Sequence, residues 1–168
     1  LYTYLLKQIV IVDVVGLSAG FVLRAIAGAV AIDVPVSFWL YLCTGLGAMM
    51  VVLSKRRAEL LKSAVEQPTT RRVLGQYSRP LLDRLQAFAA LTALGAYIGY
   101  SLTAPTLPSG FIMALTIPFV TGGLARYWYL SQIEGLGEKP EELFLSDWPL
   151  SMMVGGWLLA VVVILLLY

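Results

Sequence analysis

The chain has 168 residues, of which 59% are hydrophobic and 13% are charged, and its formal net charge is +2. Soluble domains carry about 25% charged and about 45–50% apolar residues, so this composition cannot cover a surface that faces water. It indicates an integral membrane protein. The single cysteine and the lack of histidine exclude a disulfide framework, a histidine-based zinc site and histidine-based catalysis.

Five apolar stretches are long enough to cross a bilayer as helices, because a spanning helix needs about 20 mostly apolar residues. Their hydrophobic runs are continuous, which disfavours the strictly alternating strands of a membrane β-barrel. The sequence therefore predicts an all-α fold, a polytopic transmembrane helix bundle, with a kink at Pro118 inside the fourth span. The five predicted spans cover residues 8–31, 37–54, 85–102, 109–130 and 148–168.

The chain begins with Leu1 instead of Met, and no cleavable signal sequence precedes the first apolar run. We therefore interpret residues 1–168 as a fragment, the C-terminal part of a single domain in a longer protein.

Two long connections carry most of the charge. Residues 55–84 hold eight of the twelve Lys and Arg residues, and residues 131–147 hold five acidic residues and Lys139. Threading five spans places both loops and the N-terminus on one side, which collects eleven Lys and Arg residues, whereas the other side has none. The positive-inside rule then predicts that both loops are cytoplasmic and that Tyr168 lies on the opposite side.

The first span contains two ionisable residues, Asp13 and Arg24. Their separation is close to three helical turns, so they project from one face, about 16 Å apart along the axis. Gly16, Gly20 and Gly28 share that face, and glycines allow another helix or a ligand to approach closely. Either the two charges pair with neighbouring helices and only hold the bundle together, or they line a polar cavity. We favour the cavity, because ionisable groups inside a membrane are costly and commonly functional.

A basic cluster, S-K-R-R-A-E-L-L, directly follows the second span at residues 54–61. If the helix continues, Lys55 and Glu59 lie on one face. The cluster has two interpretations that its residues do not separate. It either satisfies the positive-inside rule and attracts anionic lipid head groups, or it binds a phosphorylated substrate. Nucleic acid is disfavoured, because no aromatic residues interleave the cluster and it lies against a bilayer.

Several of these stretches together resemble one family. They are Y-T-Y-L-L-K at residues 2–7, Asp13, G-F-V-L-R-A-I-A-G at 20–28, S-x-W at 37–39, K-R-R-A-E-L at 55–60, R-Y at 126–127 and G-L-G-E-K-P-E-E at 135–142, with Asp147 after it. The chain resembles the UbiA superfamily of intramembrane prenyltransferases and, within it, the decaprenyl-phosphate phosphoribosyltransferase-like branch.

The resemblance implies nine transmembrane helices around a central cavity that opens to the cytoplasm and laterally to lipid. The five spans here would be the fifth to the ninth. It also implies Mg²⁺ as a cofactor, held mainly by an aspartate-rich motif in the N-terminal half that this chain lacks, with Glu59 as a candidate further ligand. Where aromatic-acceptor members have a second aspartate-rich motif, this chain has K-R-R-A-E, which favours the phosphoribosyl branch.

The implied reaction transfers a 5-phosphoribosyl group from phosphoribosyl pyrophosphate to a polyprenyl phosphate, in a bacterial inner membrane. We expect Lys55 and Arg56 to hold phosphate groups and Glu59 to orient one of them. We assign no catalytic residue. The other expected substrate-binding residues are Lys7, Asp13, Arg24 and Arg126.

Two alternatives stay open at this point. One alternative is a non-catalytic accessory or structural subunit of a membrane complex, because the chain lacks the first acidic motif. An aromatic-acceptor prenyltransferase is the other alternative. A homo-oligomer or a larger membrane assembly is compatible with either class.

Overall fold

A computed structural model describes residues 10–31, 33, 37–66, 79–103, 111–137 and 139–167. No strand occurs among these residues, so the predicted all-α class is confirmed. The elements are α1 (Val10–Ala31), α2 (Phe38–Glu66), α3 (Arg79–Thr103), a 3₁₀ helix η3 (Phe111–Thr116), α4 (Ile117–Gln132), α5 (Pro140–Ser146) and α6 (Trp148–Leu167).

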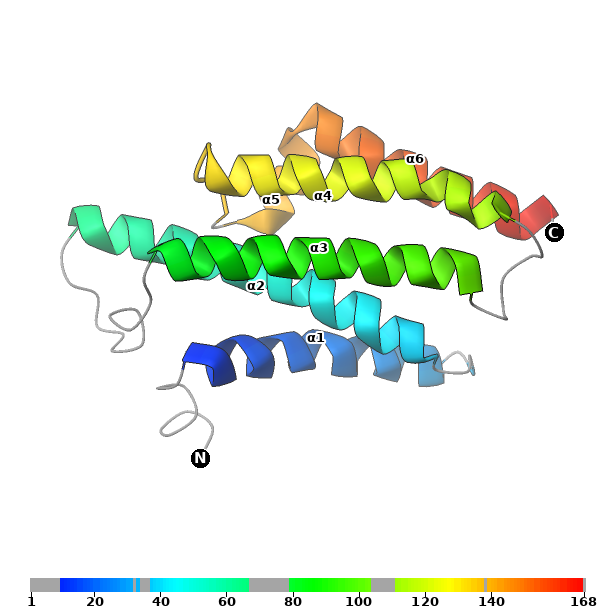
Figure 1. The fold of residues 1–168 in the computed structure, drawn as a ribbon, viewed down its shortest axis with the longest axis horizontal. Helices are drawn as coiled ribbons and strands as arrows, with labels where there is room; N and C mark the ends of the chain where they lie inside the picture. The colour runs from blue at the N-terminus through cyan, green and yellow to red at the C-terminus, as the bar shows by residue number, and fades with distance from the viewer. Residues whose placement is uncertain are drawn as a thin grey trace.

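The long helices lie roughly side by side, with α2 between its neighbours (Figure 1). α2 packs against α1 and against α3, while α4 packs against α3 and α6. The short helix α5 links α4 to α6 at one end of the bundle and packs on α6. Side chains of α2, α3 and α4 form the centre of the core, where Leu53, Leu82 and Leu130 are almost completely buried.

Among the described residues, four helices are long and apolar enough to cross a membrane. They include the segments Val12–Ala31, Phe38–Lys62, Arg79–Thr103 and Trp148–Leu167. Large apolar side chains on α1 and α6, such as Leu23 and Leu159, are exposed, as expected for surfaces that face lipid. The chain is therefore an integral membrane protein.

The fourth predicted span, residues 109–130, differs from the prediction. Its described part begins as η3 and becomes α4 at Ile117. Pro118 lies in the first turn of α4, where a missing backbone N–H is no loss, so it starts this helix and does not kink a longer one. Thr116 ends η3 by donating a hydrogen bond from Oγ1 to the Met113 carbonyl, at 2.6 Å.

The basic cluster is helical. The second apolar run ends near Ser54, but α2 continues to Glu66 and α3 begins at Arg79, so much of the predicted loop 55–84 is helix. The residues after Ser54 are mostly good helix formers, which explains why the helix outlasts its apolar run. Lys55, Arg56 and Arg57 therefore have fixed directions, about 100° apart around one helix axis.

Candidate functional site

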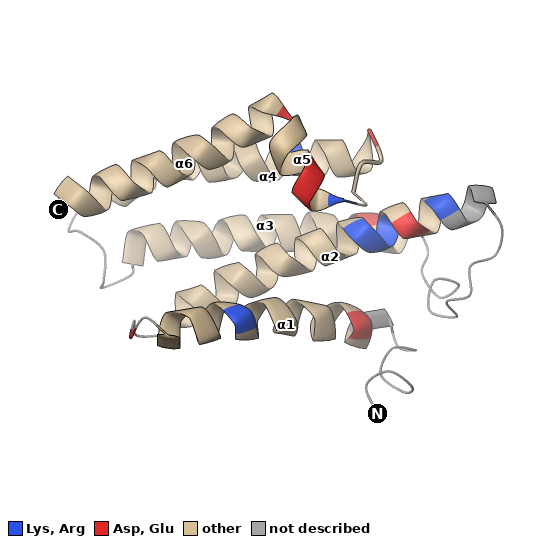
Figure 2. Ribbon diagram, turned by 180° about the vertical axis from the view of Figure 1, so that it is seen from behind, with Lys and Arg blue, Asp and Glu red and all other residues tan. Residues whose placement is uncertain are grey.

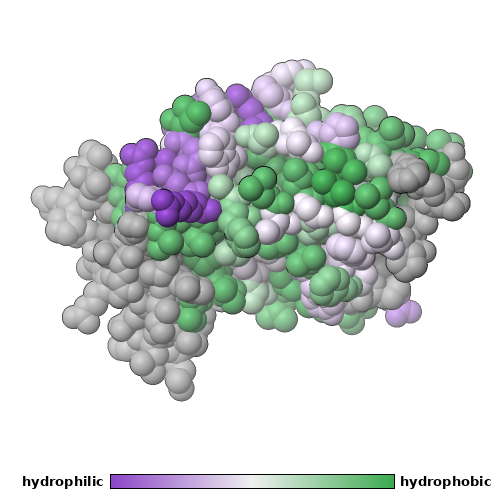
Figure 3. Space-filling model, viewed as in Figure 1, coloured by the Kyte–Doolittle hydropathy of each residue, from purple (hydrophilic) through white to green (hydrophobic). Residues whose placement is uncertain are grey.

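Charged residues gather at one end of the bundle. Figure 2 shows blue and red segments on the C-terminal part of α2, at the start of α1 and around α5. The same end carries a hydrophilic patch in the space-filling view, while much of the rest of the coloured surface on this face is hydrophobic (Figure 3). Arg24, midway along α1, is the exception among the described Lys and Arg residues.

Arg56 forms ion pairs with two carboxylates, that of Asp13 on α1 and that of Glu59 on its own helix, α2. Its Nε donates to Asp13 Oδ2 at 2.7 Å and its Nη2 to Asp13 Oδ1 at 3.4 Å, while its Nη1 donates to Glu59 Oε2 at 2.6 Å. Asp13 is 2% exposed and Arg56 is 7% exposed. Buried charges need partners, so this cluster fixes α1 against α2. The guanidinium of Arg56 thus faces carboxylates and is not an open phosphate site.

The predicted polar stripe on α1 does not have a single environment. Asp13 is buried against α2, whereas Arg24 is exposed. Among the described residues, Arg24 contacts the Phe21 ring, with its Cζ atom 5.8 Å from the ring centroid. A Cβ atom added at Gly20 or at Gly28 would meet nothing within 4 Å. Within the described residues, the face of α1 that carries Gly20, Arg24 and Gly28 is therefore open.

Lys55 is the exposed cation of the K-R-R triplet. It forms no ion pair with any residue that the structure describes. It lies on the less covered face of α2, together with the exposed Tyr41 and Lys62 and the partly buried Glu59. The predicted role of Lys55 in phosphate binding is compatible with this position.

Arg57 is a residue that sequence reasoning missed. Its side chain is 2% exposed, and its Nε donates to Asp83 Oδ1 on α3 at 2.7 Å. Its Nη1 and Nη2 donate to the carbonyls of Ser131 and Gln132 at the end of α4, at 2.8 and 2.9 Å. One side chain thereby joins three helices and caps α4 at its C-terminus. The run of three cations was the sequence signal that could have indicated a buried arginine. Three consecutive residues span about 200° around a helix, so in a packed helix they cannot all face away from its neighbours.

A buried polar layer adjoins Arg57. Ser54 Oγ donates to Ser131 Oγ at 2.7 Å, and Gln86 Nε2 donates to Ser131 Oγ at 3.0 Å. Gln132 Nε2 donates to Gln86 Oε1 at 2.8 Å. The turn after α4 approaches this layer so closely that a Cβ atom at Gly137 would lie 2.8 Å from the Ser54 carbonyl oxygen. The layer separates the charged end from the apolar interior and fixes the relative positions of α2, α3 and α4.

Arg126 pairs with Asp147. Its Nε and Nη2 donate to the two carboxylate oxygens, at 3.1 and 2.7 Å. Asp147 Oδ1 also accepts the Leu150 N–H at 2.9 Å and so caps α6. These hydrogen bonds, first that from Arg126, hold the pKa of Asp147 below its ordinary value of 3.8. Arg126 therefore ties α4 to the start of α6. The remaining predicted residue, Lys7, lies outside the described residues.

The described residues do not fit a magnesium site. No group of three or more acidic, histidine or cysteine side chains comes together among them. Glu59, the candidate ligand in this chain, is bound by Arg56, as is Asp13. Two carboxylates that share a guanidinium are poorly disposed to bind a cation.

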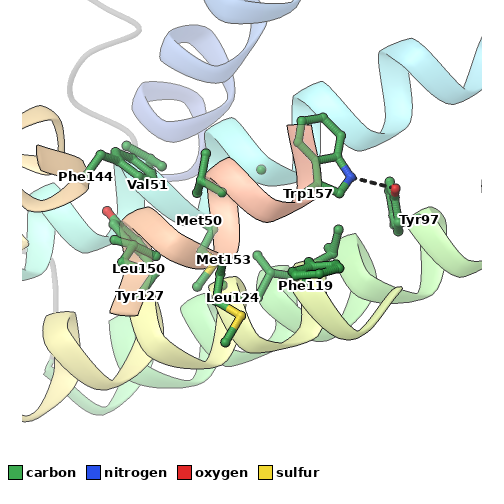
Figure 4. A pocket seen from close by; sticks show the side chains of 14 residues that line it. Met50, Val51, Tyr97, Phe119, Leu124, Tyr127, Phe144, Leu150, Met153 and Trp157 are labelled. Carbon is green, nitrogen blue, oxygen red and sulfur yellow. Dashed lines mark hydrogen bonds between the residues drawn. The ribbon is translucent and has the colours of Figure 1, made fainter. Parts of the chain in front are cut away.

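An apolar pocket lies beside α2 (Figure 4). Its volume is about 380 Å³, and α2, α4 and α6 supply most of its walls. Met50 and Val51 line it from α2, Leu124 from α4, and Met153 and Trp157 from α6. The chain thus combines a charged end with an apolar pocket inside the membrane part of the bundle, an arrangement suited to an amphiphilic ligand.

The fold and the apolar helices define an all-α integral membrane protein. No protein-family model matches the chain. It is similar to decaprenyl-phosphate phosphoribosyltransferases of Corynebacterium glutamicum (28% identical, 96% of this chain and 49% of the relative) and Mycolicibacterium smegmatis (28%, 94% and 52%). A Mycobacterium tuberculosis protein of the same name is 27% identical over 95% of this chain and 52% of the relative.

The resemblance found in the sequence is confirmed by these relatives. The chain spans about half the length of the curated relatives it matches, which fits a portion of a UbiA-like protein.

Proposed function

We propose that the complete protein transfers a 5-phosphoribosyl group from phosphoribosyl pyrophosphate to a polyprenyl phosphate. The observation that carries the proposal is the similarity to three transferases of this name along almost the whole chain. The separation of a charged end from an apolar pocket supports it, because a lipid phosphate needs both environments within a short distance.

In this reaction, a phosphate oxygen of the lipid forms a bond to C1 of the ribose. The bond between C1 and the pyrophosphate oxygen breaks, and pyrophosphate leaves with the electron pair. A lipid phosphate is already ionised near neutral pH, so the attacking oxygen needs no strong general base. A chain without histidine is compatible with this chemistry.

The residues have different roles in this proposal. Lys55 supplies an open positive charge for a phosphate group. Arg56 holds Asp13 and Glu59 in place, and we assign Glu59, the partly exposed carboxylate of the cluster, to orienting a ribose hydroxyl. Arg24 and Lys7 remain proposed contacts of the donor. Arg126 acts indirectly, by fixing α6 through Asp147. Mg²⁺ remains a proposal for the complete protein.

The test is an assay of the complete protein with labelled phosphoribosyl pyrophosphate and polyprenyl phosphate. We expect label in the lipid fraction and release of pyrophosphate in equal amounts. Failure of the intact, folded protein to transfer label would contradict the proposal and favour an accessory membrane subunit.

Arg56→Ala tests the charged cluster in the same assay. It should raise the donor KM severalfold or abolish turnover, because Asp13 and Glu59 lose the group that positions them. Lys62→Gln, on the same helix, is the control and should retain activity. Unchanged kinetics of Arg56→Ala would reject a role for the cluster in substrate binding.

A further inference from the structure

The apolar pocket has a well-defined axis. Phe144, Tyr127 and Leu150 line one end, where α5 meets α6, and Trp157 and Tyr97 line the other (Figure 4). Leu150 and Trp157 are seven residues apart on α6, which corresponds to about 10 Å along the helix. The pocket therefore runs from the charged end of the bundle toward the middle of the membrane.

The inner end is closed by a hydrogen-bonded group. Trp157 Nε1 donates to the Tyr97 hydroxyl at 2.7 Å, and that hydroxyl lies 2.7 Å from Thr116 Oγ1. The polar atoms at this end satisfy one another, so they present ring carbons to the pocket. An apolar cavity of this kind does not hold ordered water and takes hydrocarbon instead.

Lys55 lies one helical turn from the pocket. Val51 lines the pocket, and Lys55 follows it by four residues on the same face of α2, about 6 Å farther along the axis. Long helical side chains lean back toward the N-terminus, which brings the Lys55 side chain toward Val51. The charged end of the pocket therefore has a cation close to it.

The other two cations of the triplet are occupied. Arg56 is bound by Asp13 and Glu59, and Arg57 by Asp83 and two α4 carbonyls. Lys55 is thus the member of K-R-R that is open to a ligand. A cation one helical turn from an apolar pocket suits a phosphate attached to a hydrocarbon chain better than it suits a fully hydrophilic diphosphate.

We propose that Lys55 binds the phosphate of the lipid acceptor, not the diphosphate of the donor, and that the first part of the lipid chain occupies the pocket between α2, α4 and α6. This assignment rests on the proposed function, which requires two phosphorylated substrates but does not say which of them each cation binds. It makes Lys55 and the pocket the acceptor side of the site. The donor is left to the charged cluster of Asp13, Arg56 and Glu59.

Two pairs of variants of the complete protein test the assignment. Lys55→Gln removes the charge beside the pocket, and Lys62→Gln removes an exposed charge two turns farther along the same helix. Gly47→Leu fills the pocket, because Gly47 lines it and a Cβ there meets nothing within 4 Å. Gly95→Leu is its control, since Gly95 is exposed on α3 and equally unobstructed. Yield and monodispersity in detergent establish that each variant folds.

Binding is measured without the donor, in nanodiscs, with polyprenyl phosphate and with the uncharged polyprenol as probes. Lys55→Gln should weaken polyprenyl phosphate binding about tenfold, the equivalent of one charge-assisted hydrogen bond, and leave polyprenol unaffected. Gly47→Leu should weaken both lipids. Neither control should change either affinity.

Steady-state kinetics of the same variants then separate the two substrates. The acceptor KM should rise for Lys55→Gln and Gly47→Leu, while the donor KM stays constant. A higher donor KM for Lys55→Gln, or unchanged lipid binding by Gly47→Leu, would overturn the assignment. If the complete protein binds lipid phosphate through these residues but transfers no phosphoribosyl group, the proposed function fails and the acceptor site stands.

Discussion

Three consecutive cations on α2 have three different environments. Lys55 is exposed, Arg56 is buried against α1, and Arg57 is buried between α3 and α4. A helix turns by about 100° per residue, so adjacent positions necessarily face different neighbours. At the scale of residues, the basic motif therefore has one exposed cation, Lys55, and two buried arginines that hold neighbouring helices together.

Arg57→Met should be strongly destabilising. It leaves Asp83 without its ion-pair partner and removes two donors from the end of α4. Asp83 is partly exposed, so the cost arises mainly from the lost charge-assisted hydrogen bonds of the buried guanidinium, about 3 kcal/mol, and the melting temperature in detergent should fall clearly. Arg84→Met, at an exposed position on α3, is the matched control. Equal melting temperatures for the two variants would show that the Arg57 contacts contribute nothing.

Asp147 should make the stability depend on pH in the acid range. Its pKa is lowered in the folded state, so it stabilises the fold above its ordinary value of 3.8 and loses this effect as the pH falls through the lowered value. Asp147→Asn should therefore melt below the wild type at pH 7, and the difference should shrink toward pH 3. Asp147→Ala also loses the cap of α6, worth about 1 kcal/mol. A difference that is constant over this pH range would contradict the prediction.

At the scale of elements, two glycines shape the turn that follows α4. Gly135 adopts a left-handed conformation with φ of 70°, and Gly137 lies against the backbone of α2 at Ser54. The turn between them brings the end of α4 onto the polar layer. The two glycines are required for different reasons, one for its dihedral angle and one for the space around it.

Gly137→Ala should destabilise the protein by about 1–3 kcal/mol, the usual cost of overpacking, because its Cβ would lie 2.8 Å from the Ser54 carbonyl oxygen. Gly155→Ala is the control, since a Cβ there meets nothing within 4 Å. Thermal melts of both variants in one detergent provide the comparison. The close contact would be refuted if Gly137→Ala melted no lower than Gly155→Ala.

At the scale of the whole molecule, the charged end defines the proposed cytoplasmic side. The C-terminal part of α2 and the start of α3 lie at this end, and Thr103 ends α3 at the other. Lipid-facing apolar surfaces connect the two ends.

Sidedness is tested with Lys62→Cys and Thr103→Cys, each combined with Cys43→Ser and with serine at any cysteine outside residues 1–168, so that one thiol remains. A membrane-impermeant maleimide added to intact cells should label Thr103→Cys and leave Lys62→Cys unlabelled. Both should react after the membrane is permeabilised. The opposite pattern in intact cells would invert the proposed orientation.

The sequence by itself determined the membrane class, the all-α fold and the approximate position of most helices. These follow from hydropathy and local periodicity, which any window of about 20 residues contains. The resemblance was equally accessible, because it depends on short motifs. The sequence did not determine whether α2 continues through the basic cluster, because hydropathy marks the end of the apolar run and not the end of the helix.

Only the tertiary structure decided how the charged residues divide their roles. Asp13 and Arg24 share a helical phase, yet one is paired with Arg56 and the other lies on an open face. Arg57 finds Asp83 and two carbonyls that are 26, 74 and 75 residues away. Such partners depend on which helices become neighbours, and helix packing is a non-local property that spacing within one helix does not contain.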